Sequence, residues 1–230
     1  MTAVSAVIPA RNEHVAIAAV VRACRAHVDE VIVVDDASSD GTGAAAAHAG
    51  AHVIRSDVPL GKGAALRRGA RAARGEVVVF LDGDGQDAPE DIPRLLAAIA
   101  DGADLVIGSR FLGRFEHGAI TAIDHAGNRA LSWLFGRLFR VRLTDTQAGF
   151  RATRRALLQR LPLRARRYDI ETELLARALQ AGARVVEVPV RRRARAGGKT
   201  QLHRVADGLR ILSRMIAVRT GGGRRTQPLS

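Results

Sequence analysis

Cysteine and aromatic residues are scarce in this 230-residue sequence. Cys24 is the single cysteine, which excludes an internal disulfide and is typical of a protein in a reducing compartment. We interpret Cys24 as a small apolar residue of a helix. Phe, Trp and Tyr together make up 3% of the chain, so it offers few of the aromatic surfaces on which single-stranded nucleic acids stack.

Long apolar segments are missing as well. No apolar run approaches the roughly 20 residues that a membrane-spanning helix needs. The stretch Met1–Pro9 is too short for a secretory signal and has no basic segment. We therefore expect a cytoplasmic protein, and these features stay compatible with peripheral attachment to the cytosolic face of a membrane.

Acidic residues are too few to balance the basic ones. The sequence has 36 Lys and Arg against 23 Asp and Glu, a formal net charge of +13. Such an excess indicates an anionic partner: a nucleic acid, a phosphorylated substrate or an anionic membrane surface. No helix-turn-helix or RNA-binding signature accompanies the charge, so a non-catalytic nucleic-acid-binding protein is the weakest of these alternatives.

Short β-branched runs alternate with helical segments over the first 110 residues. This order predicts right-handed β-α-β crossovers, and therefore an α/β fold with a mostly parallel central sheet and flanking helices. We expect one domain over residues 1–219, with halves at 1–110 and 111–219, and a disordered tail at 220–230. The expected strands cover residues 4–8, 30–34, 52–55, 77–81, 104–107 and 184–190.

The glycine-rich segments do not match the common nucleotide-binding loops. No G-x-G-x-x-G follows the first expected strand, and Gly61-Lys62-Gly63 is not part of a G-x-x-x-x-G-K-[ST] loop. A Rossmann oxidoreductase and a P-loop ATPase are therefore poor interpretations. A nucleotidyltransferase is disfavoured too, because the glycine-rich N-terminal loop of that class is missing.

The stretch E-V-V-V-F-L-D-G-D-G-Q-D at residues 76–87 is the most informative part of the chain. Its apolar run predicts a strand buried on both faces, and open α/β sheets bind ligands where such strands end. Asp82, Asp84 and Gln86 would then present hard oxygen atoms that suit Mg²⁺ or Mn²⁺ on the phosphates of a nucleotide. The alternative is an acidic turn in which Asp87 caps the next helix.

Two later helices carry apolar residues whose direction the sequence leaves open. Residues 120–140 predict a helix in which Trp133, Leu134 and Phe135 lie among arginines. That cluster suits either the protein core or a membrane interface, where long Arg side chains can reach the headgroups. For the last amphipathic helix we expect an inward face. Its expected inward residues are Val205, Leu209, Ile211 or Leu212, and Ile216.

The ordered motifs together resemble a known family. They are P-A-R-N-E, V-V-D-D-A-S-S-D-G-T, G-K-G-A-A-L, F-L-D-G-D-G-Q, G-S-R, G-N-R, D-T-Q-A-G-F-R, E-V-P-V and R-x-G-G-K-T. Over residues 4–211 the sequence is similar to family 2 glycosyltransferases of GT-A fold, in the branch of dolichol-phosphate mannose synthase and dolichyl-phosphate glucosyltransferase. The resemblance implies an inverting transfer of a sugar from a nucleotide-sugar to a polyprenyl phosphate. It also makes 1–110 the donor-binding half and 111–219 the acceptor-binding half.

The resemblance also implies roles for individual residues. Those expected at the nucleotide are Pro9, Ala10, Asn12, Glu13, Asp35, Asp36 and Lys62. Those expected to hold Mg²⁺ or Mn²⁺ on the diphosphate are Asp82, Asp84 and Gln86. Those expected to meet the acceptor phosphate are Arg110, Arg129 and Ser132. Those expected on a loop that closes over the site are Arg193 or Arg195, together with Lys199.

The acceptor remains the most open part of this interpretation. A lipid phosphate is already ionised and needs no general base, whereas a soluble or saccharide hydroxyl acceptor needs one. Asp145 is the carboxylate expected to act as that base, although it can equally form a loop-stabilising turn. Anchored relatives carry transmembrane helices after the catalytic domain, and this sequence shows none. A lipid acceptor therefore requires direct contact with a membrane surface or a separate membrane-anchoring partner.

Overall fold

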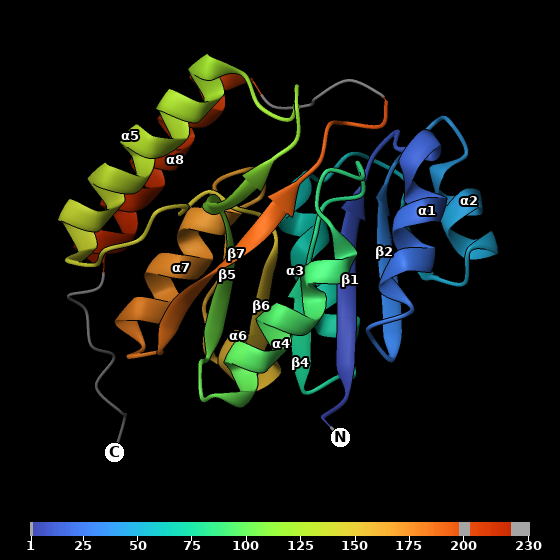
Figure 1. Ribbon diagram of the computed structural model, residues 1–230, viewed down its shortest axis with the longest axis horizontal. Coiled ribbons are helices and arrows are strands. Elements are labelled where there is room, and N and C mark those ends of the chain that lie inside the picture. The colour runs from blue at the N-terminus through green and yellow to red at the C-terminus, as the bar shows by residue number, and fades with distance from the viewer. Residues whose placement is uncertain (1, 198–202, 222–230) are drawn as a thin grey trace.

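The computed structural model describes residues 2–197 and 203–221, and these residues form a seven-stranded sheet in the order β3-β2-β1-β4-β6-β5-β7 (Figure 1). Neighbouring strands are parallel except at β6, which runs antiparallel to β4 and β5. The predicted α/β fold with a mostly parallel sheet is therefore confirmed. The strands are β1 Val4–Ala10, β2 Glu30–Asp36, β3 His52–Ser56, β4 Val77–Phe80, β5 Leu105–Phe115, β6 Arg151–Arg154 and β7 Val185–Arg192.

Helices cover both faces of this sheet. The first core packs α1, α2 and α4 on one face, and the second packs α3, α5, α6, α7 and α8 on the other. Figure 1 shows α5 and α8 side by side at one end of the molecule, with α1 and α2 at the opposite end. The helices are α1 His14–Cys24, α2 Thr42–His48, α3 Lys62–Ala72, α4 Ile92–Ala100 after a 3-10 turn at Pro89–Asp91, α5 Ala122–Phe139, α6 Arg155–Arg160, α7 Ile170–Gln180 and α8 Arg204–Gly221.

The central strands are apolar throughout because both of their faces are covered. Successive side chains of a strand point to opposite faces, and in β4 Val77 and Val79 enter the first core while Val78 and Phe80 enter the second. All of β4 is buried. Burial of these four large side chains contributes about 1.5–3 kcal/mol each before the cost of chain ordering. The polar residues that follow β4 are therefore held at the end of a fully buried strand.

Strand β6 is the element that the sequence did not predict. Its residues, R-A-T-R, continue the polar segment D-T-Q-A-G-F and carry no alternating apolar pattern. The strand forms because Ala152 pairs with Val79 on one side and with Val106 on the other. Partners more than 40 residues away thus determine its structure, and propensity yields to tertiary pairing.

The predicted division of the chain at residue 110 does not coincide with an element boundary. Strand β5 runs from Leu105 to Phe115 across that position, and β6 and β7 of the second half complete the same sheet. Helix α8 continues to Gly221, two residues into the predicted tail that begins at Thr220. The remaining tail residues, 222–230, lie outside the described residues.

The structure decides which apolar residues of the last helices are buried. In α8 the buried apolar residues are Ile211, Met215 and Val218, whereas the expected inward residues Val205 and Leu209 are 78% and 63% exposed. The sequence prediction for that face is therefore wrong except at Ile211. Ile216, also expected inward, is exposed.

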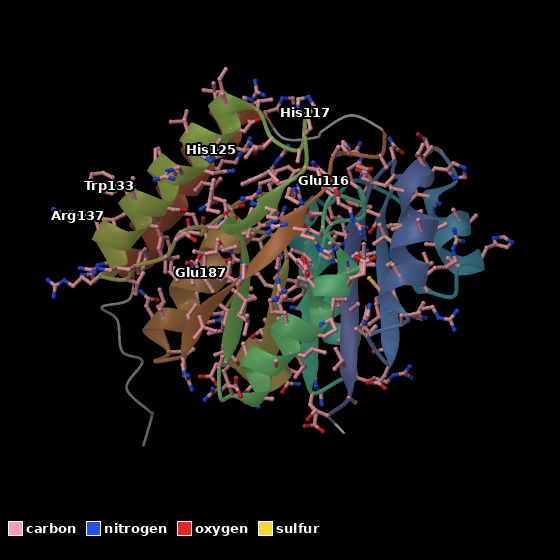
Figure 2. The ribbon with its side chains drawn as sticks, in the orientation of Figure 1. Glu116, His117, His125, Trp133, Arg137 and Glu187 are labelled. Carbon is pink, nitrogen blue, oxygen red and sulfur yellow. The ribbon has the colours of Figure 1, made fainter. Side chains whose placement is uncertain are left out.

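Helix α5 likewise has both buried and exposed apolar residues. Phe135 is fully buried and stacks on Phe139 at a centroid distance of 4.3 Å, while Leu134 packs against the second core. Trp133 is 68% exposed, and Figure 2 shows it on the outer side of α5. In the described part of the chain, no helix is both long and apolar enough to cross a bilayer.

Candidate active site

The carboxyl ends of β1, β2 and β4 lie next to a cavity of about 1170 Å³. This is the edge at which open α/β sheets bind ligands. Pro9, Ala10 and Glu13 line the cavity from the end of β1 and the start of α1, and Asp82 and Asp84 line it just after β4. Helices α5 and α8 supply apolar lining from the other side. These apolar residues are Ile123, Leu131, Val205 and Ile211.

Lys62 links Asp82 to Glu171 in the wall of this cavity. Its Nζ lies 2.7 Å from Asp82 Oδ1 and 2.8 Å from Glu171 Oε1, and 5.6 Å from the ring centroid of Tyr168. Burial raises the pKa of Asp82, but the charges of Lys62 and Arg192 outweigh burial and hold that pKa below its ordinary value. Asp82 is therefore an anion at neutral pH, and Lys62 is its cationic partner.

Arg195 makes the corresponding link between Asp84 and Glu13. Its Nη1 lies 2.9 Å from Asp84 Oδ2, and its Nη2 pairs with the Glu13 carboxylate. Burial and then repulsion from Asp82 raise the pKa of Asp84. Burial also raises the pKa of Glu13 to about 7, although Arg195 opposes this shift. The end of β4 therefore gathers three carboxylates, Glu13, Asp82 and Asp84, whose mutual repulsion Lys62 and Arg195 offset only in part.

The side chain of Gln86 is occupied by protein contacts. Its Oε1 accepts from Arg192 Nη2 at 2.8 Å, and its Nε2 donates to the carbonyls of Ala119 and Arg193. Arg192 also pairs with Asp87 at 2.6 Å. The predicted metal-ligand role of Gln86 is therefore not supported, because its oxygen already holds Arg192 and fixes the loop after β7.

Asp82 and Asp84 fit a divalent cation. Carboxylate oxygens are preferred ligands of Mg²⁺ and Mn²⁺, and Mg²⁺ is commonly held by one or two carboxylates together with substrate phosphates. The repulsion that raises the pKa of Asp84 is what a cation between the two carboxylates would relieve. Over residues 2–197 and 203–221, no cluster of three or more His, Cys, Asp or Glu is placed to hold a metal.

Arg110 lines the cavity, and Asp145 holds one edge of its guanidinium. Its Nε and Nη2 each donate to an Asp145 oxygen at 2.7 Å, and its backbone N donates to the same carboxylate at 3.1 Å. Asp145 is fully buried behind the guanidinium and is not part of the cavity lining. Its predicted role as a general base is therefore not supported by the geometry, which instead makes it a positioning residue for Arg110.

Several predicted site residues do not line the cavity. Asn12 adopts φ 56° and its side-chain oxygen accepts from Ser39 N at 2.9 Å, so it joins two loops. Asp35 is buried and pairs with Arg55 at 3.1 Å. Its neighbour Asp36 does line the cavity, but its two oxygens accept from the backbone N of Leu60 and of Gly61.

Some of the residues predicted to meet the acceptor, or to lie on the closing loop, also lie outside the cavity lining. Arg129 is exposed on α5 outside the cavity lining, and Ser132 is buried, where its hydroxyl accepts from Thr146 N at 3.0 Å. Arg193 points to Glu90, with an Nη2–Oε2 distance of 2.8 Å. Lys199 lies outside the described residues. Of the predicted arginines, Arg110 and Arg195 are the two that reach the site.

Two further residues, Glu171 and Arg151, support the site, and neither is among the residues predicted for it. Glu171 is buried beside Lys62, and its signal in the sequence is an acidic residue in the apolar helix segment I-E-T-E-L-L. Arg151 is fully buried and donates at 2.7 Å to the carbonyls of Thr146, Ala148 and Glu171. Burial lowers its pKa to about 10. Arg151 therefore fixes the loop whose Ala148 lines the cavity.

The sheet order, the carboxylate pair at the end of β4 and the structures it resembles define a glycosyltransferase of GT-A fold. The chain belongs to glycosyl transferase family 2, whose family model matches residues 5–166. The family expected from the ordered motifs is thereby confirmed.

Similar proteins indicate the branch of this family. An uncharacterized glycosyltransferase of Mycobacterium tuberculosis is 37% identical over 200 residues, which cover 87% of this chain and 89% of the relative. The undecaprenyl-phosphate mannosyltransferase of Micrococcus luteus is 38% identical over 176 residues, or 70% of each chain. Relatives of this kind place the chain in the dolichol-phosphate mannose synthase-like branch.

A solved structure resembles the whole fold. It is glucosyl-3-phosphoglycerate synthase from Mycobacterium tuberculosis in complex with Mn²⁺, uridine diphosphate and phosphoglyceric acid. The TM-score is 0.74 at 26% sequence identity, and the match covers 95% of this chain and 78% of the other.

Proposed function

We propose that this protein transfers a sugar from a nucleotide-sugar to a polyprenyl phosphate, with inversion and with Mg²⁺ or Mn²⁺ in the donor site. The observation that carries the proposal is the carboxylate pair Asp82 and Asp84 in a cavity that continues to the apolar lining of α5 and α8. A relative named undecaprenyl-phosphate mannosyltransferase supports the acceptor class. A structural neighbour bound to Mn²⁺ and uridine diphosphate supports the donor class.

The donor diphosphate would lie against the end of β4. Asp82 and Asp84 would hold the cation, which when bound would neutralise negative charge that develops on the leaving diphosphate. Lys62 keeps Asp82 ionised through a contact of 2.7 Å. Pro9, Ala10 and the cavity side of Asp36 would border the nucleotide. GDP and UDP donors, carrying mannose or glucose, both remain candidates for this site.

The acceptor phosphate would approach from the side of Arg110. A guanidinium can bind phosphate oxygens in a two-point contact, and the phosphate is already ionised at neutral pH. It can attack the anomeric carbon without a general base, and a single displacement of this kind inverts that carbon. This agrees with the position of Asp145, which holds Arg110 and is shielded from the cavity.

The apolar lining suits the first isoprenoid units of a lipid acceptor. We propose a peripheral protein on the cytosolic face of a membrane, attached directly or through a separate membrane-anchoring partner. Trp133, Val205 and Leu209 support direct attachment because these large apolar side chains are exposed on adjacent helices. No nucleic-acid partner is part of this proposal.

A donor and acceptor panel tests the function. Purified protein is incubated with Mn²⁺, UDP-glucose or GDP-mannose, and farnesyl phosphate, and the glycolipid is detected by mass spectrometry. We expect a glycosyl farnesyl phosphate, and we expect Asp84→Asn or EDTA to reduce its formation at least about 100-fold. Full activity of Asp84→Asn, or full activity with EDTA, would exclude the metal assignment.

A soluble hydroxyl acceptor is the second candidate. It is favoured by the structural neighbour that is bound to phosphoglyceric acid. The same panel with phosphoglyceric acid in place of farnesyl phosphate separates the two. Turnover of phosphoglyceric acid without any lipid phosphate, together with no turnover of farnesyl phosphate, would favour the second candidate over the first.

A further inference from the structure

Arg110 has one satisfied edge and one free edge. Its Nε and Nη2 are bound to Asp145, whereas Nη1 makes no hydrogen bond among the described residues. The direction of the free edge is therefore set by the position of the Asp145 carboxylate. A bidentate guanidinium–carboxylate pair fixes orientation as well as distance.

Glu187 on β7 holds the backbone that carries Asp145. Its Oε1 accepts from Asp145 N at 2.8 Å, and its Oε2 accepts from Thr144 N at 2.7 Å and from Thr144 Oγ1 at 3.0 Å. Ser109, the residue before Arg110, reaches the same threonine with an Oγ–Oγ1 distance of 2.6 Å. Glu187, labelled in Figure 2, thus joins the loop to the sheet behind Arg110.

The rest of the loop is fixed from other directions. Ser132 accepts from Thr146 N, and Arg151 donates to the carbonyls of Thr146 and Ala148. The backbone at residues 144 and 145 has Glu187 as its acceptor. Removing Glu187 would therefore free that end of the loop and leave two amide groups to find other partners.

We infer that Glu187 is a positioning residue for the transfer reaction: through Thr144 and Asp145 it sets the direction of the free edge of Arg110 and so the affinity for a phosphate group. The phosphate as ligand rests on the proposed function, whereas the link from Glu187 to Arg110 does not. At metal sites, residues that orient a metal ligand change affinity about 10–100-fold when they are removed, and we expect an effect of that order here.

The experiment compares Glu187→Ala and Glu187→Gln with the wild type and with Glu76→Ala. Glu76 is an exposed glutamate just before β4. Affinities for farnesyl phosphate and for UDP are measured separately. We expect Glu187→Ala to weaken farnesyl phosphate binding about tenfold and to leave UDP binding unchanged. The affinity of Glu187→Gln for farnesyl phosphate should lie between those of the wild type and Glu187→Ala, because its amide retains one acceptor oxygen. Glu76→Ala should behave as the wild type.

A second measurement follows Arg110 without any ligand. The Nε–H signal of Arg110, assigned by its loss in Arg110→Lys, should be protected from solvent exchange in the wild type and exposed in Glu187→Ala. Because Glu187 acts through Asp145, Glu187→Ala should add little to Asp145→Asn in a double-mutant cycle. A protected Nε–H in Glu187→Ala, additive effects, or equal loss of UDP binding would overturn the inference.

These experiments distinguish an error in the proposed function from an error in the role of Glu187. If wild-type protein binds no farnesyl phosphate, the acceptor assignment is wrong, and the exchange of the Arg110 Nε–H alone decides the role of Glu187. If Glu187→Ala does not fold, Glu187→Gln carries the same comparison, since it preserves the size of the side chain.

Discussion

Arg195 contacts the Asp84 carboxylate, which the proposed metal-bound donor would also contact. Its guanidinium neutralises Asp84 and Glu13 together, and a divalent cation that takes the Asp84 carboxylate has to displace it. We predict that Arg195→Met binds Mn²⁺ about tenfold more tightly than the wild type in the absence of nucleotide, because a charge-assisted hydrogen bond no longer competes. Titration calorimetry with MnCl₂ measures this affinity.

Arg193→Met is the matched control, because Arg193 pairs with Glu90 outside the cavity lining. Its Mn²⁺ affinity should equal that of the wild type. Unchanged or weaker Mn²⁺ binding in Arg195→Met would show that Arg195 does not compete for Asp84.

The raised pKa of Glu13 leads to a prediction of how the stability of the protein depends on pH. Burial, opposed by Arg195, raises its pKa to about 7 from its ordinary value of 4.5. Between these values the folded protein binds more protons at this group than the unfolded chain, so this group lowers the free energy of unfolding as the pH rises. Glu13→Gln removes that contribution. We therefore expect the free energy of unfolding of Glu13→Gln, relative to that of the wild type, to increase as the pH rises from 5 to 8.

Urea unfolding of both proteins at pH 5, 6, 7 and 8 measures the difference. A constant difference in the free energy of unfolding across this range would contradict the raised pKa.

At the scale of elements, helix α3 packs closely on the sheet because Gly69 has no side chain. A Cβ at this position would lie 2.3 Å from Val7 Cγ1 and 3.1 Å from Val34 Cγ2. Val7 and Val34 are fully buried, so neither can move away freely. We predict that Gly69→Ala lowers the free energy of unfolding by about 1–3 kcal/mol, as measured by urea unfolding.

Gly208 in α8 provides the comparison, since a Cβ there would meet no atom within 4 Å. Gly208→Ala should raise stability by up to about 1 kcal/mol, because alanine favours the helix more than glycine does. Equal effects of the two substitutions would show that α3 does not depend on close contact with β1 and β2.

At the scale of the whole molecule, the exposed apolar residues of α5 and α8 gather at one end, far from α1 and α2 (Figure 1). Exposed arginines accompany them, namely Arg129 and Arg137 of α5 and Arg140 just after it. Large apolar side chains flanked by cations are typical of a membrane-surface contact. We predict that Trp133→Ser with Leu209→Ser abolishes co-sedimentation with vesicles that contain anionic lipid and preserves UDP affinity.

Val15→Ser is the control for this experiment, because Val15 is equally exposed on α1 at the other end of the molecule. It should sediment as the wild type does. Unchanged sedimentation of the double variant would show that α5 and α8 do not bind the membrane through these residues. It would favour a separate anchoring partner.

The sequence alone determined the features that depend on neighbouring residues. A buried strand followed by D-G-D-G-Q places Asp82 and Asp84 at the end of β4 whatever the rest of the chain does, because the strand fixes where its own end lies. The same local logic placed Pro9 at the end of β1 and Glu13 just beyond it, and the alternation of strands and helices predicted the parallel part of the sheet.

Tertiary structure decided every feature that depends on direction or on a distant partner. Strand β6 exists because β4 and β5 leave a place between them, and no local pattern marks it. Asp145, Ser132 and Arg129 carry suitable chemistry, yet packing turns the first two away from the cavity and leaves the third outside its lining. A side chain can face the site or the core from the same sequence position, and that choice is made by partners more than 30 residues away, as Arg110 and Asp145 show.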